Sequence, residues 1–250
     1  MWRGTGITHA GRVRQTNQDA FAVEDRLRLW VVADGMGGRA GGDIASQVAV
    51  KTIVGCFQPS AENAEQTIEA ASTALRRAIE AGDMAIRTET DAHPDLKGMG
   101  TTIVALVLSQ ASQEKAIVAH VGDSRAYLLR AKRLTPLTED HSLVEDYLRQ
   151  GLISRADALI HPQRHIVTRA LGIEGQAEPE SSVHLIERDD IFLLCTDGLT
   201  KMLEDDEILE TILASGKSAE AACSSLVTAA NERGGSDNIT VLIVRDEQAA

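Results

Sequence analysis

Aromatic residues and positive charge are both scarce in this sequence. Phe, Trp and Tyr make up 3% of its 250 residues, and 25 Lys and Arg stand against 37 Asp and Glu, which gives a formal net charge of −12. No block of Lys and Arg, and no basic stripe with interleaved aromatic residues, is present to bind the phosphates of a polymer. The composition argues against a nucleic-acid partner, so any phosphate group must be bound locally.

Long apolar runs are also missing. The longest spans residues 103–108, which is far too short to cross a bilayer, and residues 1–6 lack the apolar stretch of a signal peptide. We therefore expect a soluble, cytoplasmic protein without a membrane segment.

Cysteine is equally sparse. The chain has three cysteines, an odd number at wide spacing, so a disulfide framework is not expected. Cys195 lies inside the apolar run 191–195, and no basic residue beside it in the sequence would stabilise a thiolate. We interpret it as a buried core thiol and not as a nucleophile.

The apolar pattern predicts one large domain over residues 1–250, because 43% of the residues are apolar and no stretch resembles a linker. Most predicted strands are joined by turns too short for a crossover helix, which favours antiparallel sheets. A segment interrupted by Gly, Pro and charged residues, at about 151–175, is a candidate flap insertion. Strands are predicted at 4–8, 20–24, 28–33, 101–108, 116–121, 126–129, 183–185, 191–194 and 239–244, and helices at 43–54, 62–89, 142–150, 205–214 and 218–231.

Four aspartates each stand at the end of an apolar run or shortly after it, and each is next in the sequence to a residue that favours turns. Because rigid strands hold such positions while loops leave them open to substrate, function concentrates there. An Asp-Gly or Asp-Asn pair alone is an ordinary turn, but four at strand ends favour one carboxylate cluster. They are Asp34, Asp123, Asp197 and Asp237.

Electrostatics indicates what such a cluster requires. Two carboxylates about 5 Å apart repel by roughly 3 kcal/mol at an effective dielectric constant of about 20. A bound cation, or a raised pKa on some of the carboxyls, is needed to make the cluster tolerable. All-oxygen sites suit Mg²⁺, Mn²⁺ or Ca²⁺, and no His or Cys ligand spacing appears near the four aspartates.

A dinucleotide fingerprint is the competing motif at Gly35-Met-Gly37-Gly-Arg-Ala40, which follows an apolar run. The strand and acidic residue expected about twenty positions later are missing. Asp34, directly before the glycines, would also repel a pyrophosphate. We therefore reject the dinucleotide interpretation.

Seven short segments, in order, resemble the motif series of the metal-dependent serine/threonine protein phosphatases of the protein phosphatase 2C type, bacterial branch. Together they cover nearly the whole chain. They are Arg14-Gln-Thr-Asn-Gln-Asp19, Asp34-Gly-Met-Gly-Gly, Gly100-Thr-Thr, Gly122-Asp-Ser-Arg125, Leu137-Thr-Glu-Asp-His141, Cys195-Thr-Asp-Gly198 and Ser236-Asp-Asn-Ile-Thr240.

This resemblance implies an α+β fold, a four-layer α-β-β-α sandwich of two antiparallel sheets flanked by helices. It also implies two tightly bound Mn²⁺ or Mg²⁺ ions. Asp34 would bridge both ions, the carbonyl of Gly35 would ligate the second, and Asp197 and Asp237 would complete the first. Asp19 would not contact the ions but would accept hydrogen bonds from metal-bound water. Asp123 would share a third, more weakly bound ion with Asp197.

The implied reaction is hydrolysis of a phosphomonoester by a metal-activated water, with no protein nucleophile. Arg14 resembles the family arginine that grips the phosphate through paired hydrogen bonds. Met36 stands where many eukaryotic members carry a histidine proposed as the proton donor, so a metal-bound water is the alternative acid. For His141, His161 and His165 we expect structural roles.

The expected substrates are phosphoserine and phosphothreonine in proteins, opposed by a serine/threonine kinase, and a monomer is expected. Two other hypotheses stay open. One is a phosphatase of a small phosphorylated metabolite on the same fold, and the other is a non-catalytic module that binds divalent cations.

Overall fold

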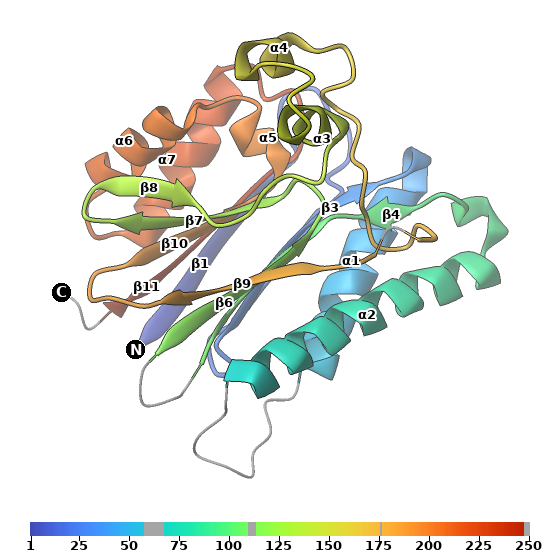
Figure 1. Ribbon diagram of the computed structural model, residues 1–250, viewed down its shortest axis with the longest axis horizontal. Helices are drawn as coiled ribbons and strands as arrows, with labels where there is room; N and C mark the ends of the chain where they lie inside the picture. The colour runs from blue at the N-terminus through green and yellow to red at the C-terminus, as the bar shows by residue number, and fades with distance from the viewer. Residues whose placement is uncertain (58–67, 110–113, 176, 248–250) are drawn as a thin grey trace.

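The computed structural model describes residues 1–57, 68–109, 114–175 and 177–247. Two antiparallel sheets lie face to face, and helices cover the outer face of each, which confirms the expected four-layer α-β-β-α sandwich (Figure 1). One sheet has the strand order β1 (Trp2–His9), β11 (Ile239–Asp246), β10 (Ile191–Cys195), β7 (Arg125–Arg130) and β8 (Arg133–Pro136). The other runs β2 (Asp19–Glu24), β3 (Leu29–Met36), β5 (Ile103–Leu108), β6 (Lys115–Val121) and β9 (Glu180–Leu185), and β4 (Gly100–Thr101) also pairs with β3.

The helices form the outer layers. α6 (Asp205–Ala214) and α7 (Ala219–Glu232) cover the first sheet, and α1 (Gly38–Cys56) and α2 (Ile68–Ala92) cover the second (Figure 1). The short helices α3 (Leu143–Arg149), α4 (Arg155–Ile160) and α5 (Asp197–Thr200) gather at one end of the sandwich (Figure 1). A short 3₁₀ helix, η1, spans Pro94–Leu96.

Continuous apolar runs form the central strands because both faces of each sheet are buried. Along β3, Val31 and Ala33 pack against α1 and α2, whereas Trp30 and Val32 face the opposite sheet. Successive side chains of a strand point to opposite faces, so the central strands each contribute to two of the three apolar layers. A run such as β5, buried at every position, follows from this arrangement.

The predicted elements are confirmed in position, with differences at their ends. Helix α1 starts five residues earlier than predicted, at Gly38, because Gly41 and Gly42 let its first turn lie against Met99 and Gln18. Residues 62–67 of the predicted helix 62–89 lie outside the described residues. The predicted strand 101–108 is two strands, β4 and β5. The sequence pattern missed β8, α4 and α5.

Residues 151–175 contain α4 and two isolated bridges that tie the segment to the body of the protein. The bridges pair Val167 with Ser142 and Leu171 with Thr101. In Figure 1 this segment stands at the sandwich end where α5 lies. No helix of the described residues is both long and apolar enough to cross a membrane.

Candidate metal centre

Asp19 lies opposite Asp34 in the register of strands β2 and β3. It is buried, and its Oδ2 accepts hydrogen bonds from Thr196 Oγ1 at 2.9 Å and Thr240 Oγ1 at 2.7 Å. Both threonines belong to the opposite sheet, at the end of β10 and within β11. Asp19 therefore ties the two sheets together at the point where the acidic strand ends meet.

The loops carrying Asp197 and Asp237 are held side by side. The β-carbon of any residue replacing Gly198 would collide with the carbonyl oxygen of Asn238. The Asn238 side chain is itself fixed, because its Oδ1 accepts from the Gln18 N–H at 2.8 Å and its Nδ2 donates to two further backbone carbonyls. The close approach places both aspartates at one end of the first sheet.

Asp34 and Gly35 are positioned through their backbones. The Asp34 N–H donates to Thr102 Oγ1 at 3.0 Å, and Thr101 Oγ1 donates to the Asp34 carbonyl at 2.9 Å. Gly35 leaves no space for a β-carbon, because the carbonyls of Gly42 and Gln18 lie against it. Only glycine fits at this position.

Asp123 approaches the same centre from the β6–β7 turn. It is 9% exposed and follows Gly122, whose φ of +106° suits glycine and disfavours other residues. Next to it, the hydroxyl of Ser124 lies 2.7 Å from Thr102 Oγ1, the atom that also accepts from the Asp34 N–H. A short hydrogen-bonded chain thus joins the Asp123 turn to Asp34.

The pKa shifts show that these carboxylates influence one another. Burial and then the negative charges of Asp19, Asp197, Asp123 and Asp237 hold the pKa of Asp34 well above its ordinary value. Burial raises the pKa of Asp19 to about 7, although its two threonine hydrogen bonds oppose the shift. Burial and the charge of Asp197 raise the pKa of Asp123 to about 8. The structure therefore brings all five predicted aspartates into one centre.

The residues present fit a pair of hard divalent cations. Buried Oδ1 atoms of Asp19 and Asp197 have no hydrogen-bond partner within the described part of the chain. Mutual repulsion, burial and unpaired carboxylate oxygens are all relieved by a cation bound among them. An all-oxygen donor set suits Mn²⁺ and Mg²⁺.

Two basic side chains contact the cluster. Arg14 directs its fork at Asp237, with Nε 2.9 Å from Oδ1 and Nη2 3.0 Å from Oδ2, and its side chain is 52% exposed. Lys201 forms ion pairs with Asp197 and with Asp237. Burial lowers the pKa of Lys201, but the two carboxylates outweigh it and the pKa is raised above its ordinary value. The sequence analysis identified Arg14 and missed Lys201, because it did not predict helix α5, whose single turn brings Lys201 next to Asp197.

Comparison with known proteins agrees with this geometry. A family model described as protein phosphatase 2C matches residues 4–233. The chain belongs to the protein phosphatase 2C family. It is 42% identical over 240 residues to the serine/threonine phosphatase stp of Listeria welshimeri, covering 95% of this chain and 93% of that protein.

Solved structures of the family superimpose closely. The Mycobacterium tuberculosis serine/threonine phosphatase PstP/Ppp gives a TM-score of 0.85 at 33% identity, covering 98% of each chain. A catalytic domain of PstP in complex with two manganese ions gives a TM-score of 0.82 at 31% identity, covering 98% of this chain and 97% of that one.

A second group with possible metal ligands lies beside the aspartate cluster. Ligand atoms of His120, His141 and Glu180 lie within 4.8 Å of one another. The Nδ1 of His141 accepts from the Gly122 N–H at 3.1 Å, and the His120 Nε2 lies 2.7 Å from the Glu139 carbonyl oxygen. The other ring nitrogen of His141, Nε2, lies 3.3 Å from Glu180 Oε1 and 3.2 Å from Arg169 Nη1. The group therefore links the Asp123 turn to neighbouring loops.

Cys195 is fully buried in β10, as the apolar run predicted. Burial raises the pKa of its thiol to about 12. A thiol with this pKa stays protonated at neutral pH and cannot act as a nucleophile.

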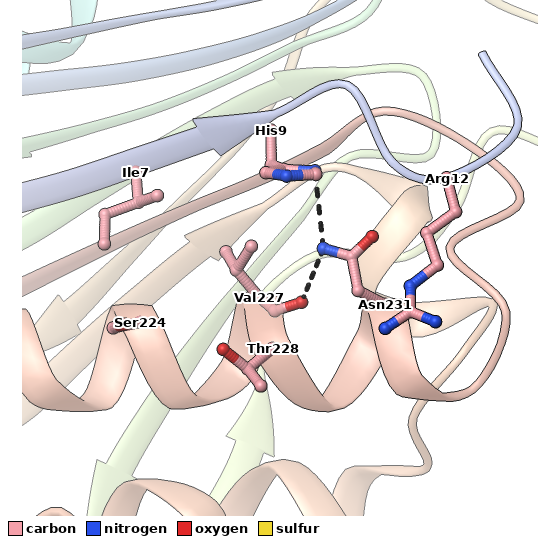
Figure 2. A pocket seen from close by; sticks show the side chains of 7 residues that line it. All are labelled: Ile7, His9, Arg12, Ser224, Val227, Thr228 and Asn231. Carbon is pink, nitrogen blue, oxygen red and sulfur yellow. Dashed lines mark hydrogen bonds between the residues drawn. The ribbon is translucent and has the colours of Figure 1, made fainter.

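A hollow of about 420 Å³ lies between the end of β1 and helix α7, and Figure 2 shows its lining. There the Asn231 amide donates to the Val227 carbonyl at 3.0 Å and lies 3.3 Å from His9 Nδ1. None of the five clustered aspartates lines it. Its wall includes Arg12, two residues before Arg14, so the hollow backs the loop that carries the arginine.

Proposed function

We propose that this protein is a metal-dependent phosphatase that hydrolyses phosphoserine and phosphothreonine in proteins and so reverses serine/threonine kinase signalling. Family membership supports the reaction class. The observation that carries the proposal is the convergence of five aspartates whose buried oxygens include atoms without a hydrogen-bond partner in the described chain. Such a centre is costly unless it binds cations.

The proposed ligands are assigned as follows. Asp34 would be a ligand of both ions of a Mn²⁺ or Mg²⁺ pair. The Gly35 carbonyl would be a further ligand of the second ion, and Asp197 and Asp237 would be further ligands of the first ion. Asp19, already fixed by two threonine hydroxyls, would orient water from the next shell.

Asp123 is proposed for a third, weaker position shared with Asp197. Support comes from the raised pKa of Asp123, in which the charge of Asp197 is a cause after burial.

The bound ion pair would supply Lewis acidity that activates a water for attack on phosphorus. Arg14 would bind the phosphate dianion through its planar fork, exchanging its present partner Asp237 for the substrate. No covalent phosphoenzyme is expected, because Cys195 is buried and protonated. Met36 has no proton to give, so the leaving oxygen would take its proton from water.

Phosphorylated proteins are the proposed substrates and a serine/threonine kinase the proposed opposing enzyme, with the protein acting as a cytoplasmic monomer. The segment 151–175 is proposed as a flap over the substrate, supported by its place at the sandwich end where α5 lies.

A direct test compares turnover of a phosphothreonine peptide with turnover of a set of small phosphorylated metabolites, each with Mn²⁺ and with excess chelator. We expect Mn²⁺-dependent release of phosphate, fastest from the peptide. Faster turnover of a metabolite would favour the alternative substrate class. Metal binding without turnover of either would favour a non-catalytic cation-binding module.

A further inference from the structure

Lys201 stands directly after the helical turn that begins with Asp197. Its backbone N–H donates to the Asp197 carbonyl at 2.7 Å, which places Lys201 one helical turn after that residue. The Lys201 ammonium forms one ion pair with Asp197 Oδ2 and a second, at 3.4 Å, with Asp237 Oδ2. A positive charge therefore lies between the two carboxylates that the proposed function assigns to one metal ion.

Charge balance explains why it lies there. Among the residues whose side chains are described, Arg14 and Lys201 are the cationic groups paired with the five clustered aspartates. Arg14 reaches only Asp237, whereas Lys201 spans Asp197 and Asp237. Lys201 is thus the charge that offsets repulsion between these two carboxylates when no metal is present.

An ammonium and a divalent cation compete for these two carboxylates. Both are attracted to the negative charge of Asp197 and Asp237, and their positive charges repel each other at contact distance. The Lys201 side chain is 40% exposed, and its four-carbon stem is flexible. It can leave the carboxylates for solvent without repacking the core.

We propose that Lys201 is an internal counterion that a divalent metal must displace, so that metal loading exchanges Lys201 for the ion and Lys201 sets the metal affinity. This inference rests on the proposed ligand set of Asp197 and Asp237. The exchange has two consequences: the metal-free protein is protected from the repulsion of its own carboxylates, and the metal is bound less tightly than the same aspartates would bind it without the lysine.

The test is calorimetric titration of metal-free protein with Mn²⁺, comparing the parent with Lys201→Met, which keeps an unbranched side chain and removes the charge. We expect the dissociation constant to fall by about tenfold or more. Lys201→Arg keeps the charge and should stay within about threefold of the parent. Lys217→Met, at an exposed lysine between α6 and α7, controls for net charge and should change binding less than about twofold.

Thermal unfolding gives a second readout that does not depend on turnover. In chelator, Lys201→Met should unfold about 2–4 °C below the parent, and at saturating Mn²⁺ the two Tm values should coincide. Unchanged or weaker Mn²⁺ binding by Lys201→Met, or equal tightening by Lys217→Met, would overturn the exchange. If instead the parent neither binds Mn²⁺ nor releases phosphate, the proposed function itself fails.

Discussion

The backbone of Gly198 packs directly on the carbonyl oxygen of Asn238, and this contact sets the spacing of Asp197 and Asp237. Replacing Gly198 by Ala would push the two loops apart at the metal centre. Overpacking of this kind costs about 1–3 kcal/mol. We expect Gly198→Ala to lower the free energy of unfolding in urea by this amount and to weaken Mn²⁺ binding.

Gly55→Ala is the matched control, since a β-carbon there has no neighbouring atom within 4 Å and Gly55 lies in helix α1. Ala should be neutral or stabilise the helix by up to about 1 kcal/mol. Wild-type Mn²⁺ affinity in Gly198→Ala would show that the contact does not position the aspartates.

Removing the metal should abolish activity reversibly. The all-oxygen centre predicts loss of turnover in EDTA and recovery with Mn²⁺ or Mg²⁺ but not with Ca²⁺, because Ca²⁺ is larger, tolerates irregular coordination and acidifies water poorly. Phosphate release from a phosphothreonine peptide measures this. Full activity in excess chelator would contradict the proposed chemistry.

Arg14→Ala should lower kcat/KM, because a charge-assisted contact to the phosphate is lost. The loss of transition-state stabilisation should be about 1.5–3 kcal/mol. Mn²⁺ affinity should change little or rise slightly, since Asp237 loses a competing partner. Steady-state kinetics and calorimetry distinguish the two effects. Arg12→Ala, at the neighbouring hollow, serves as the control and should behave like the parent. Loss of metal from Arg14→Ala would make the arginine structural instead.

Asp197→Asn should be far more damaging to turnover than Cys195→Ser, although the residues lie two positions apart. Asp197 contributes charge to the metal centre, whereas the Cys195 thiol is buried with a raised pKa of about 12. A serine hydroxyl at this apolar position should cost about 1–3 kcal/mol of stability without removing activity. A folded but inactive Cys195→Ser variant, or a trapped phosphocysteine, would support a cysteine mechanism.

The metal-free protein should lose stability as the pH rises. Asp19 and Asp123 have folded-state pKa values of about 7 and about 8, above their ordinary value, so the folded protein binds protons more tightly than the unfolded chain. Their contribution is fully present below the ordinary carboxyl pKa of about 4 and is lost as the pH rises to the folded-state values. Tm in chelator should therefore fall between about pH 4 and pH 8 and level off above.

Saturating Mn²⁺ should flatten that pH dependence, because the ions replace the protons as the balancing charge. Asp123→Asn should make the decline shallower and end it near pH 7, where Asp19 alone would end it. A metal-free Tm that rises over this interval would contradict the clustering of the carboxylates.

Much of the fold follows from residue pattern, because strands buried on both faces appear as unbroken apolar runs. β8 escaped prediction since its four residues, Arg133–Pro136, are partly exposed and carry no such run. The early start of α1 could not be predicted, because Gly41 and Gly42 disfavour a helix locally. The two glycines are explained only by their close contacts with Met99 and Gln18. Tertiary packing decided both cases.

The aspartates were visible as strand-end residues, but their partners were not. Thr196 and Thr240 bond to Asp19 across the two sheets, at sequence separations of 177 and 221 residues. No local pattern reveals contacts of that range. Lys201 shares this difficulty, since its ion pair with Asp237 depends on how two distant loops meet.

The central place of β11 has a consequence for how the chain folds. β1 and β10 each pair with β11 and not with each other, and Trp2 finds its partner at Asp246. Strand β1 therefore has no partner in this sheet until residues 239–246 are available. Such distant pairing makes folding slow. Pairing of β11 also brings Asp237, two residues before it, into place, so the aspartate cluster is complete only when this sheet has closed.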